Sequence, residues 1–124
     1  MDTALKLYKS FIDDLASGQM QNSVGVKRVR EKLLWPDTAS DELTRQNKII
    51  ESLNDEERSI IADMLQEERD SGIHDVLVYL EDQMCLNGLR IVINGVELPV
   101  DPFWDMYHDW QYRRSGESWP DERE

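Results

Sequence analysis

The stretch that decides the fold class is LRIVINGVELPV, residues 89–100, with Asn94-Gly95 at its centre. Asn-Gly accepts the positive φ angles that both central positions of a two-residue hairpin turn require. Such a turn fixes the register, and here it pairs apolar residues throughout: Ile93 with Val96, Ile91 with Leu98 and Leu89 with Val100. Because two strands alone are barely stable in water, we expect a two-stranded antiparallel β-hairpin over about residues 89–100 whose apolar face rests on helices.

Helical periodicity surrounds this hairpin. Before it, apolar residues recur at helical spacing in five segments, over about residues 2–17, 26–35, 40–53, 54–71 and 73–85. After it, Asp101 as N-cap and Pro102 at the first helical position predict a last helix that stops at Gly116. The sequence therefore predicts a helix-dominated α+β fold of five or six helices and one hairpin, in a single domain over residues 1–124 with 117–124 as a candidate flexible tail.

Breaking and capping residues predict where these helices begin and end. Pro36 is expected to end the second helix, and Asn54 followed by Glu57 has the pattern of a capping box. Ser71-Gly72 is expected to separate the fourth helix from the fifth. The fifth helix carries a stripe that predicts its buried side: Ile73, Val76, Leu77, Leu80 and Met84.

Composition restricts the classes of function. The chain has 26 acidic and 14 basic side chains among 124 residues, a net charge of −12. That charge argues against binding nucleic acid or an anionic membrane, and it favours a basic protein partner. The single cysteine, Cys85, cannot form an internal disulfide and is expected as a small buried residue. The start has no signal-peptide pattern, and the longest apolar run, 76–80, is too short to span a bilayer. We therefore expect a cytoplasmic protein.

Motifs that carry chemistry are mostly absent. The sequence has no nucleophile elbow, no phosphate-binding loop and no dinucleotide fingerprint, so no cofactor is expected. The weak candidates for a metal site are His74 with Asp75 and His108 with Asp105. No His-x-x-x-His or Glu-x-x-His pair places two such ligands on one helical face. We therefore expect His74 to bond locally in the first turn of a helix and His108 to lie on a solvated flank, rather than both around an ion.

Aromatic residues gather near the end of the chain. Six of the ten aromatic residues fall between Phe103 and Trp119. One interpretation is that this segment completes the core, with Trp119 holding the tail against it. The other is that Trp104 and Tyr112 form a contact patch for a partner, flanked by Arg113 and Arg114.

Four stretches of the sequence resemble a known family. They are SGIHD at 71–75, NGLRI at 87–91, NGVEL at 94–98, and the closing pattern MYxDW…GExWP over 106–120. The sequence is similar there to a family of short bacterial proteins classed as a domain of unknown function, over most of the chain from about Leu53 onward. The resemblance implies a free-standing bacterial cytoplasmic domain and implies no activity, cofactor or catalytic residue.

Two classes of function fit these observations. The first is a small acidic protein-interaction module of the antitoxin, immunity or adaptor type, which binds a basic protein or a second copy of itself as a homodimer. A free hairpin edge could accept a partner strand, and the charge would speed docking. The alternative is a small metal-dependent enzyme that uses His74, His108 and nearby aspartates. The two imidazoles would then have to lie close to one shared ion.

Overall fold

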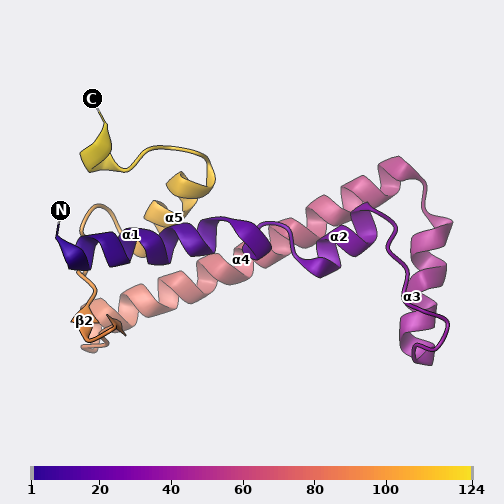
Figure 1. Ribbon diagram of the computed structural model, residues 1–124, viewed down its shortest axis with the longest axis horizontal. Helices are drawn as coiled ribbons and strands as arrows, with labels where there is room; N and C mark the ends of the chain where they lie inside the picture. Colours follow the sequence, from indigo (N-terminus) through magenta and orange to yellow (C-terminus); the bar gives the residue numbers. More distant parts are fainter. Residues whose placement is uncertain (1, 124) are drawn as a thin grey trace. The chain divides into compact units, whose positions relative to one another are not determined.

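The computed structural model describes residues 2–123, apart from the side chain of Gln19 (Figure 1). These residues form five α-helices and one β-hairpin, which confirms the predicted helix-dominated α+β class. In chain order the elements are α1 (Thr3–Ala16), η1 (Gly18–Met20), α2 (Val24–Arg30), α3 (Asp41–Ser52), α4 (Asp55–Leu86), β1 (Val92–Ile93), β2 (Val96–Glu97), α5 (Met106–Arg114) and η2 (Pro120–Glu122).

The contacts divide the chain into two compact units. The first unit comprises Met1–Met20 and Ser71–Glu124, and the second comprises Gln21–Asp70. The first unit thus joins α1 to the second half of α4, the hairpin and α5. The second holds α2, α3 and the first half of α4.

α4 is longer than the sequence pattern predicted. It runs without a break for 32 residues, so the prediction that Ser71-Gly72 separates two helices is wrong. Its start is as predicted. The Asn54 side-chain oxygen accepts a hydrogen bond from the Glu57 backbone N–H (2.8 Å), and the Glu57 carboxylate accepts one from the Asn54 backbone N–H (2.9 Å). A helical glycine weakens a helix but keeps its amide, so it does not end the helix as proline does.

The second helix is shorter than predicted. α2 ends at Arg30, before Pro36, and Lys32 takes a positive φ of 55°. The chain that follows is held by a side chain instead of by helical hydrogen bonds. The Asn47 amide of α3 accepts a bond from the Trp35 backbone N–H (2.7 Å) and donates one to the Trp35 carbonyl (2.9 Å).

The hairpin has the predicted turn and register but fewer pairs. Asn94 and Gly95 have φ of 50° and 76°, and Ile93 pairs with Val96. The pairing ends before Leu89 because the Leu89 amide bonds the Gln83 carbonyl at the end of α4. Each strand is therefore two residues long, although Leu98 still donates to the Ile91 carbonyl (2.8 Å).

The last helix begins later than predicted. Asp105, not Asp101, is its N-cap and accepts a hydrogen bond from the His108 amide (2.9 Å). Asp101 has a φ of 50°, which a helical N-cap does not have. Gly116 ends the helix as predicted: it has a positive φ, and the Glu117 amide bonds the Tyr112 carbonyl, the pattern of a Schellman motif.

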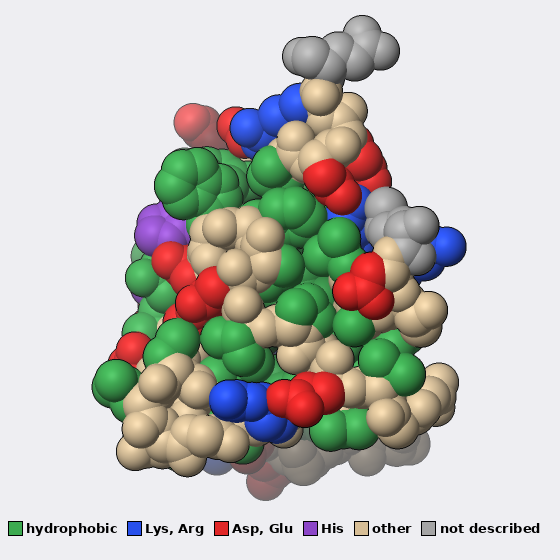
Figure 2. Space-filling model, turned by 90° about the vertical axis from the view of Figure 1, so that its left-hand side faces the viewer, with side chains coloured by type: hydrophobic (Ala, Val, Ile, Leu, Met, Phe, Trp, Pro, Cys, Tyr) green, Lys and Arg blue, Asp and Glu red, His purple; other side chains and the backbone are tan. Residues whose placement is uncertain are grey.

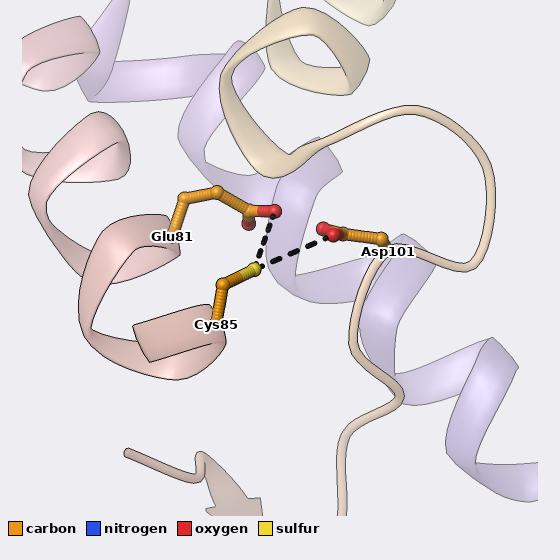
Figure 3. A group of neighbouring side chains, drawn as sticks. All are labelled: Glu81, Cys85 and Asp101. Atoms are coloured by element: carbon orange, nitrogen blue, oxygen red, sulfur yellow. Dashed lines mark hydrogen bonds between the residues drawn. The ribbon is translucent and has the colours of Figure 1, made fainter. Parts of the chain in front are cut away.

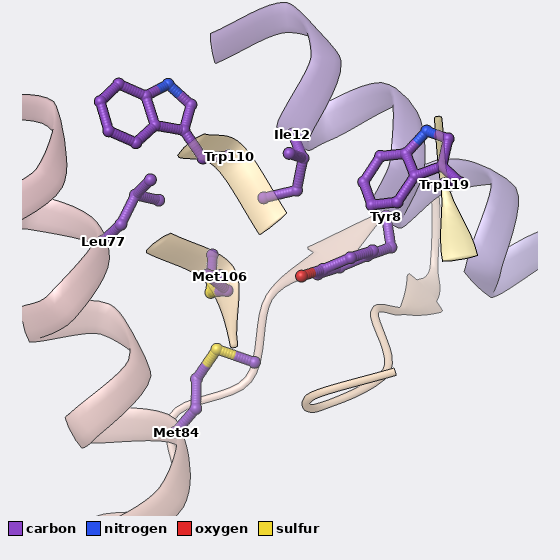
Figure 4. Close-up of a cluster of buried hydrophobic side chains, with 7 residues drawn as sticks. All are labelled: Tyr8, Ile12, Leu77, Met84, Met106, Trp110 and Trp119. Carbon is purple, nitrogen blue, oxygen red and sulfur yellow. The ribbon is translucent and has the colours of Figure 1, made fainter. Parts of the chain in front are cut away.

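The core of the first unit lies between α1, α4 and α5 (Figure 4). Its buried members are Tyr8, Ile12, Leu77, Met84, Met106, Trp110 and Trp119. Trp119 brings the chain after α5 into this core, as one interpretation of the aromatic cluster predicted. Lys9 of α1 then binds Asp121 (2.8 Å) and Glu122 (3.0 Å). Burial alone would lower the pKa of Lys9, but these two carboxylates outweigh it and raise the pKa.

Candidate functional site

Three polar side chains meet at the edge of this core (Figure 3). Glu81 and Cys85 extend from one side of α4, and Asp101 faces them from the loop after the hairpin. The Cys85 thiol lies 3.7 Å from Glu81 Oε1 and 3.6 Å from Asp101 Oδ2, so it can donate to either carboxylate. Cys85 is exposed, and the prediction that it is a buried residue is wrong. Its side of α4 faces this loop rather than the apolar core.

Two carboxyl groups and a thiol lie close together in this cluster, and burial together with this proximity raises the pKa values of Glu81 and Cys85. Glu81 is only 7% exposed, and it accepts a hydrogen bond from the Met106 amide (3.5 Å). The pKa of Glu81 is raised to about 7. The largest cause is burial, and the second is the Asp101 carboxyl, with which Glu81 shares a hydrogen bond. Loss of solvent around the sulfur, with the charges of Asp101 and Glu81, raises the pKa of the Cys85 thiol. The cluster therefore favours a protonated thiol, which is a poor nucleophile.

A second buried acid lies on α5. Asp109 accepts hydrogen bonds from the Tyr8 hydroxyl (2.5 Å) and from the Trp104 amide (3.4 Å). Burial raises the pKa of Asp109 although both hydrogen bonds oppose it. Burial and Asp109 also raise the pKa of Tyr8. Because Tyr8 and Asp109 are both nearly inaccessible to solvent, this pair joins α1 to α5 and is not placed to reach a substrate.

The histidines do not gather around a common metal position. His74 lies inside α4, with Nδ1 3.5 Å from Asp75, and His108 Nδ1 lies 2.8 Å from Asp105. Both imidazoles contact the ring of Tyr107, at centroid distances of 5.4 and 4.6 Å. Among residues 2–123, neither histidine belongs to a group of three acidic, cysteine or histidine ligand atoms within 4.8 Å of one another. The four metal candidates therefore form two local pairs.

Glu81, Cys85 and Asp101 do form such a group within the described residues. Two carboxylate oxygens and one sulfur could contribute three ligands to a divalent ion once the thiol had lost its proton. In the structure the Cys85 thiol lies within hydrogen-bond distance of both carboxylates, so the three groups interact with one another.

The aromatic and arginine candidates have separate environments. Trp104 is 60% exposed, whereas Tyr112 is partly buried beside the His108 ring. Arg113 binds Asp13 (2.7 Å) and the Glu117 carbonyl (2.7 Å). The Arg114 guanidinium lies 4.6 Å from the Trp110 ring centroid. Their role in binding a partner stays a prediction.

An apolar face of α4 is left uncovered in the first unit. Val76, Tyr79 and Leu86 are 57%, 62% and 79% exposed. Gln83, which is partly buried, lies on the same line along the helix, and we call these four residues the exposed stripe. Val76 was predicted to be buried with Leu77, but the structure buries only Leu77 of the two. Figure 2 shows hydrophobic side chains exposed on one face of the first unit, among acidic and basic ones.

Sequence reasoning missed Glu81 and the exposed stripe. Glu81 follows Leu77 by four residues and precedes Met84 by three, so it interrupts the buried side of an amphipathic helix. A carboxylate at such a position is a signal that could have been noticed. The exposure of Val76 could not have been predicted, because helical periodicity does not show how much of the apolar face of α4 is covered by the other elements.

The chain belongs to a protein family. Residues 1–121 match the family described as "Family of unknown function (DUF6547)", which confirms the resemblance seen in the sequence. No curated protein matches the chain, and no solved structure matches it. Separately, none of the helices in the described part of the chain combines the length and hydropathy that crossing a membrane requires.

Proposed function

We propose that the protein is a small acidic interaction module, of the antitoxin, immunity or adaptor type, that binds another protein through the exposed stripe. The observation that carries this proposal is the exposure of Val76, Tyr79 and Leu86 on one side of a helix whose opposite side is in the core. Isolated exposed apolar residues are ordinary, but aligned ones are typical of a surface that a partner covers. Tyrosine is also enriched at binding hot spots.

The charge supports a protein partner over a nucleic acid. The net charge of −12 would repel phosphates and attract a basic protein. We infer a bacterial cytoplasmic location as part of this proposal: the family resemblance in the sequence implies a bacterial protein, and a lone cysteine suits a reducing compartment. Addition of a partner strand to the hairpin has less support, since each strand offers two residues of edge.

Site-specific photo-crosslinking in cells tests the proposal. A photoreactive residue replaces Tyr79 in the full chain, and a matched variant carries it at Glu67, which is exposed on the same helix but outside the stripe. We expect one dominant protein adduct from position 79 that position 67 does not give. The adduct should weaken when Leu86→Ser is added, because that change removes the most exposed apolar side chain of the stripe.

Two results would overturn the proposal. Equal adducts from both positions, or none from either, would mean that the stripe binds no protein. An adduct with the mass of two copies of this chain would mean that the stripe makes a homodimer. In that case the partner would be the chain itself.

A further inference from the structure

We propose that the partner of the exposed stripe is a basic amphipathic α-helix of another protein. This inference rests on the proposed function and adds the shape and charge of the partner. Three observations carry it: the spacing of the stripe, the acidic edge beside it, and the absence of a basic residue that would let a second copy pair there.

The spacing of the stripe is that of a helix-packing face. Val76, Tyr79, Gln83 and Leu86 follow each other at intervals of three, four and three residues. This is the repeat with which one α-helix meets another along a shared seam. A strand or an irregular loop has no matching period, so a helix is the element that can contact all four positions at once.

The edge of the stripe is acidic. Asp75 and Asp82 lie one residue before Val76 and Gln83, and both aspartates are exposed. These are the positions whose side chains reach across a helix pair to the flank of the partner. Residues 71–89 include no lysine or arginine, so no cation of this segment neutralises that edge. A partner helix with lysine or arginine along its flank would place positive charges next to Asp75 and Asp82.

The same charges disfavour a second copy of this chain. An antiparallel pair of stripes would set Asp75 and Asp82 of one copy against the same residues of the other. In a parallel pair, Asp75 and Asp82 of one copy would face Leu80 and Asn87 of the other copy. Neither of those residues carries a positive charge. Each copy also brings a net charge of −12. Like charges across a seam raise the free energy of that pairing, so the edge selects against self-association.

The test uses a synthetic peptide as the probe. It is a helix of leucine and lysine in which leucines repeat at three- and four-residue intervals and lysines flank them. Its control has the same composition in an order that scatters the leucines around the helix. Binding of the labelled peptides to the full-length protein is followed by fluorescence anisotropy at about 0.1 M salt, where long-range attraction is largely screened. We expect the amphipathic peptide to bind at least about tenfold more tightly than the scrambled one.

Paired variants separate the apolar contribution from the charge contribution. Tyr79→Ser with Leu86→Ser should weaken binding of the amphipathic peptide by about tenfold or more, since both exposed anchors are lost. Asp75→Asn with Asp82→Asn should weaken it by at least about threefold. The matched control is Glu51→Gln with Glu67→Gln, which removes the same charge from exposed positions outside the stripe and should leave binding unchanged. All these positions are exposed, so each variant is expected to fold, and circular dichroism is the measurement that checks this.

Three results would overturn the inference: equal binding of the two peptides, unchanged binding by the Tyr79→Ser, Leu86→Ser variant, or equal losses in the two charge variants. Any of them would show general attraction between a cationic peptide and an acidic protein. The crosslink from position 79 would then still decide the proposed function, because it does not depend on the chemistry of the partner.

Discussion

Gly72 lies inside α4, and apart from its chain neighbours and the backbone of the same helix turn no atom lies within 4 Å of the place where a Cβ would stand. The helix therefore contains its least favourable ordinary residue at a position with room for a better one. We predict that Gly72→Ala stabilises the protein by about 0.5–1 kcal/mol, because alanine loses less backbone entropy on folding. Thermal or urea unfolding measures the change.

The control for this prediction is Gly116→Ala. Gly116 also has open space around it, but its φ of 85° strains any residue with a Cβ. The control should lose stability while Gly72→Ala gains it. A loss of stability in Gly72→Ala would contradict the uninterrupted helix described here.

Glu81 predicts how stability depends on pH. Its pKa is raised to about 7 in the folded protein, from an ordinary value of 4.5, and the burial that raises it is lost on unfolding. The folded state thus binds the proton more tightly. The contribution of Glu81 to the free energy of unfolding is fully present below its pKa in the unfolded chain. It is lost as the pH rises through its pKa in the folded protein. The pKa of Asp109 is raised as well, which acts in the same direction.

We therefore expect the free energy of unfolding to fall as the pH rises from about 4.5 to about 7. Glu81→Gln should flatten this slope, because glutamine stays neutral while it keeps a donor and an acceptor for Asp101 and Met106. Denaturant unfolding at both pH values measures it. Glu67→Gln, at an exposed position, is the control and should keep the wild-type slope. Equal slopes in wild type and Glu81→Gln would refute this assignment.

At the scale of elements, the hairpin depends on its turn. Asn94 and Gly95 both have positive φ, and the ladder beyond them is only two pairs long. We predict that Gly95→Val destabilises the protein by about 1–2 kcal/mol, because a β-branched side chain resists that conformation. Leu98 is buried next to the ladder, so the loss should register in global unfolding. A wild-type melting temperature would mean that the turn is not formed as described.

At the scale of the whole molecule, the sequence predicts one domain whereas the contacts define two units. α4 belongs to both, because it passes from residues 55–70 of one unit into residues 71–86 of the other. If one unit unfolded, its half of α4 would lose its packed neighbours, and the half in the other unit would gain a new, uncapped helix end. We therefore expect the two units to unfold together.

Tryptophan provides a probe in each unit. Trp35 is the one tryptophan of the second unit, and Trp110 and Trp119 are buried in the first. Fluorine NMR of protein labelled with fluorotryptophan follows each ring separately through a urea titration. Coincident midpoints for all rings are expected of a single cooperative domain. Distinct midpoints for Trp35 and Trp110 would show that the units are separate domains.

Local chemistry made several elements predictable. The Asn54 and Glu57 capping box, the Asn94-Gly95 turn and the Gly116 stop each depend on residues no more than five positions apart. The backbone preferences of such short segments are largely their own, so the sequence determined these features, the helix-dominated class with its one hairpin, and the acidic charge.

Tertiary structure alone decided the rest. Tyr8 meets Asp109 across 101 positions of sequence, and Asp101 reaches Glu81 only because the loop after the hairpin returns to α4. The same is true of surfaces: Val76 and Leu77 are adjacent and equally apolar, yet only one is covered by neighbouring elements. Burial depends on which elements pack together, and no local pattern encodes that. The raised pKa of Glu81 and the exposed stripe were therefore visible only in the folded protein.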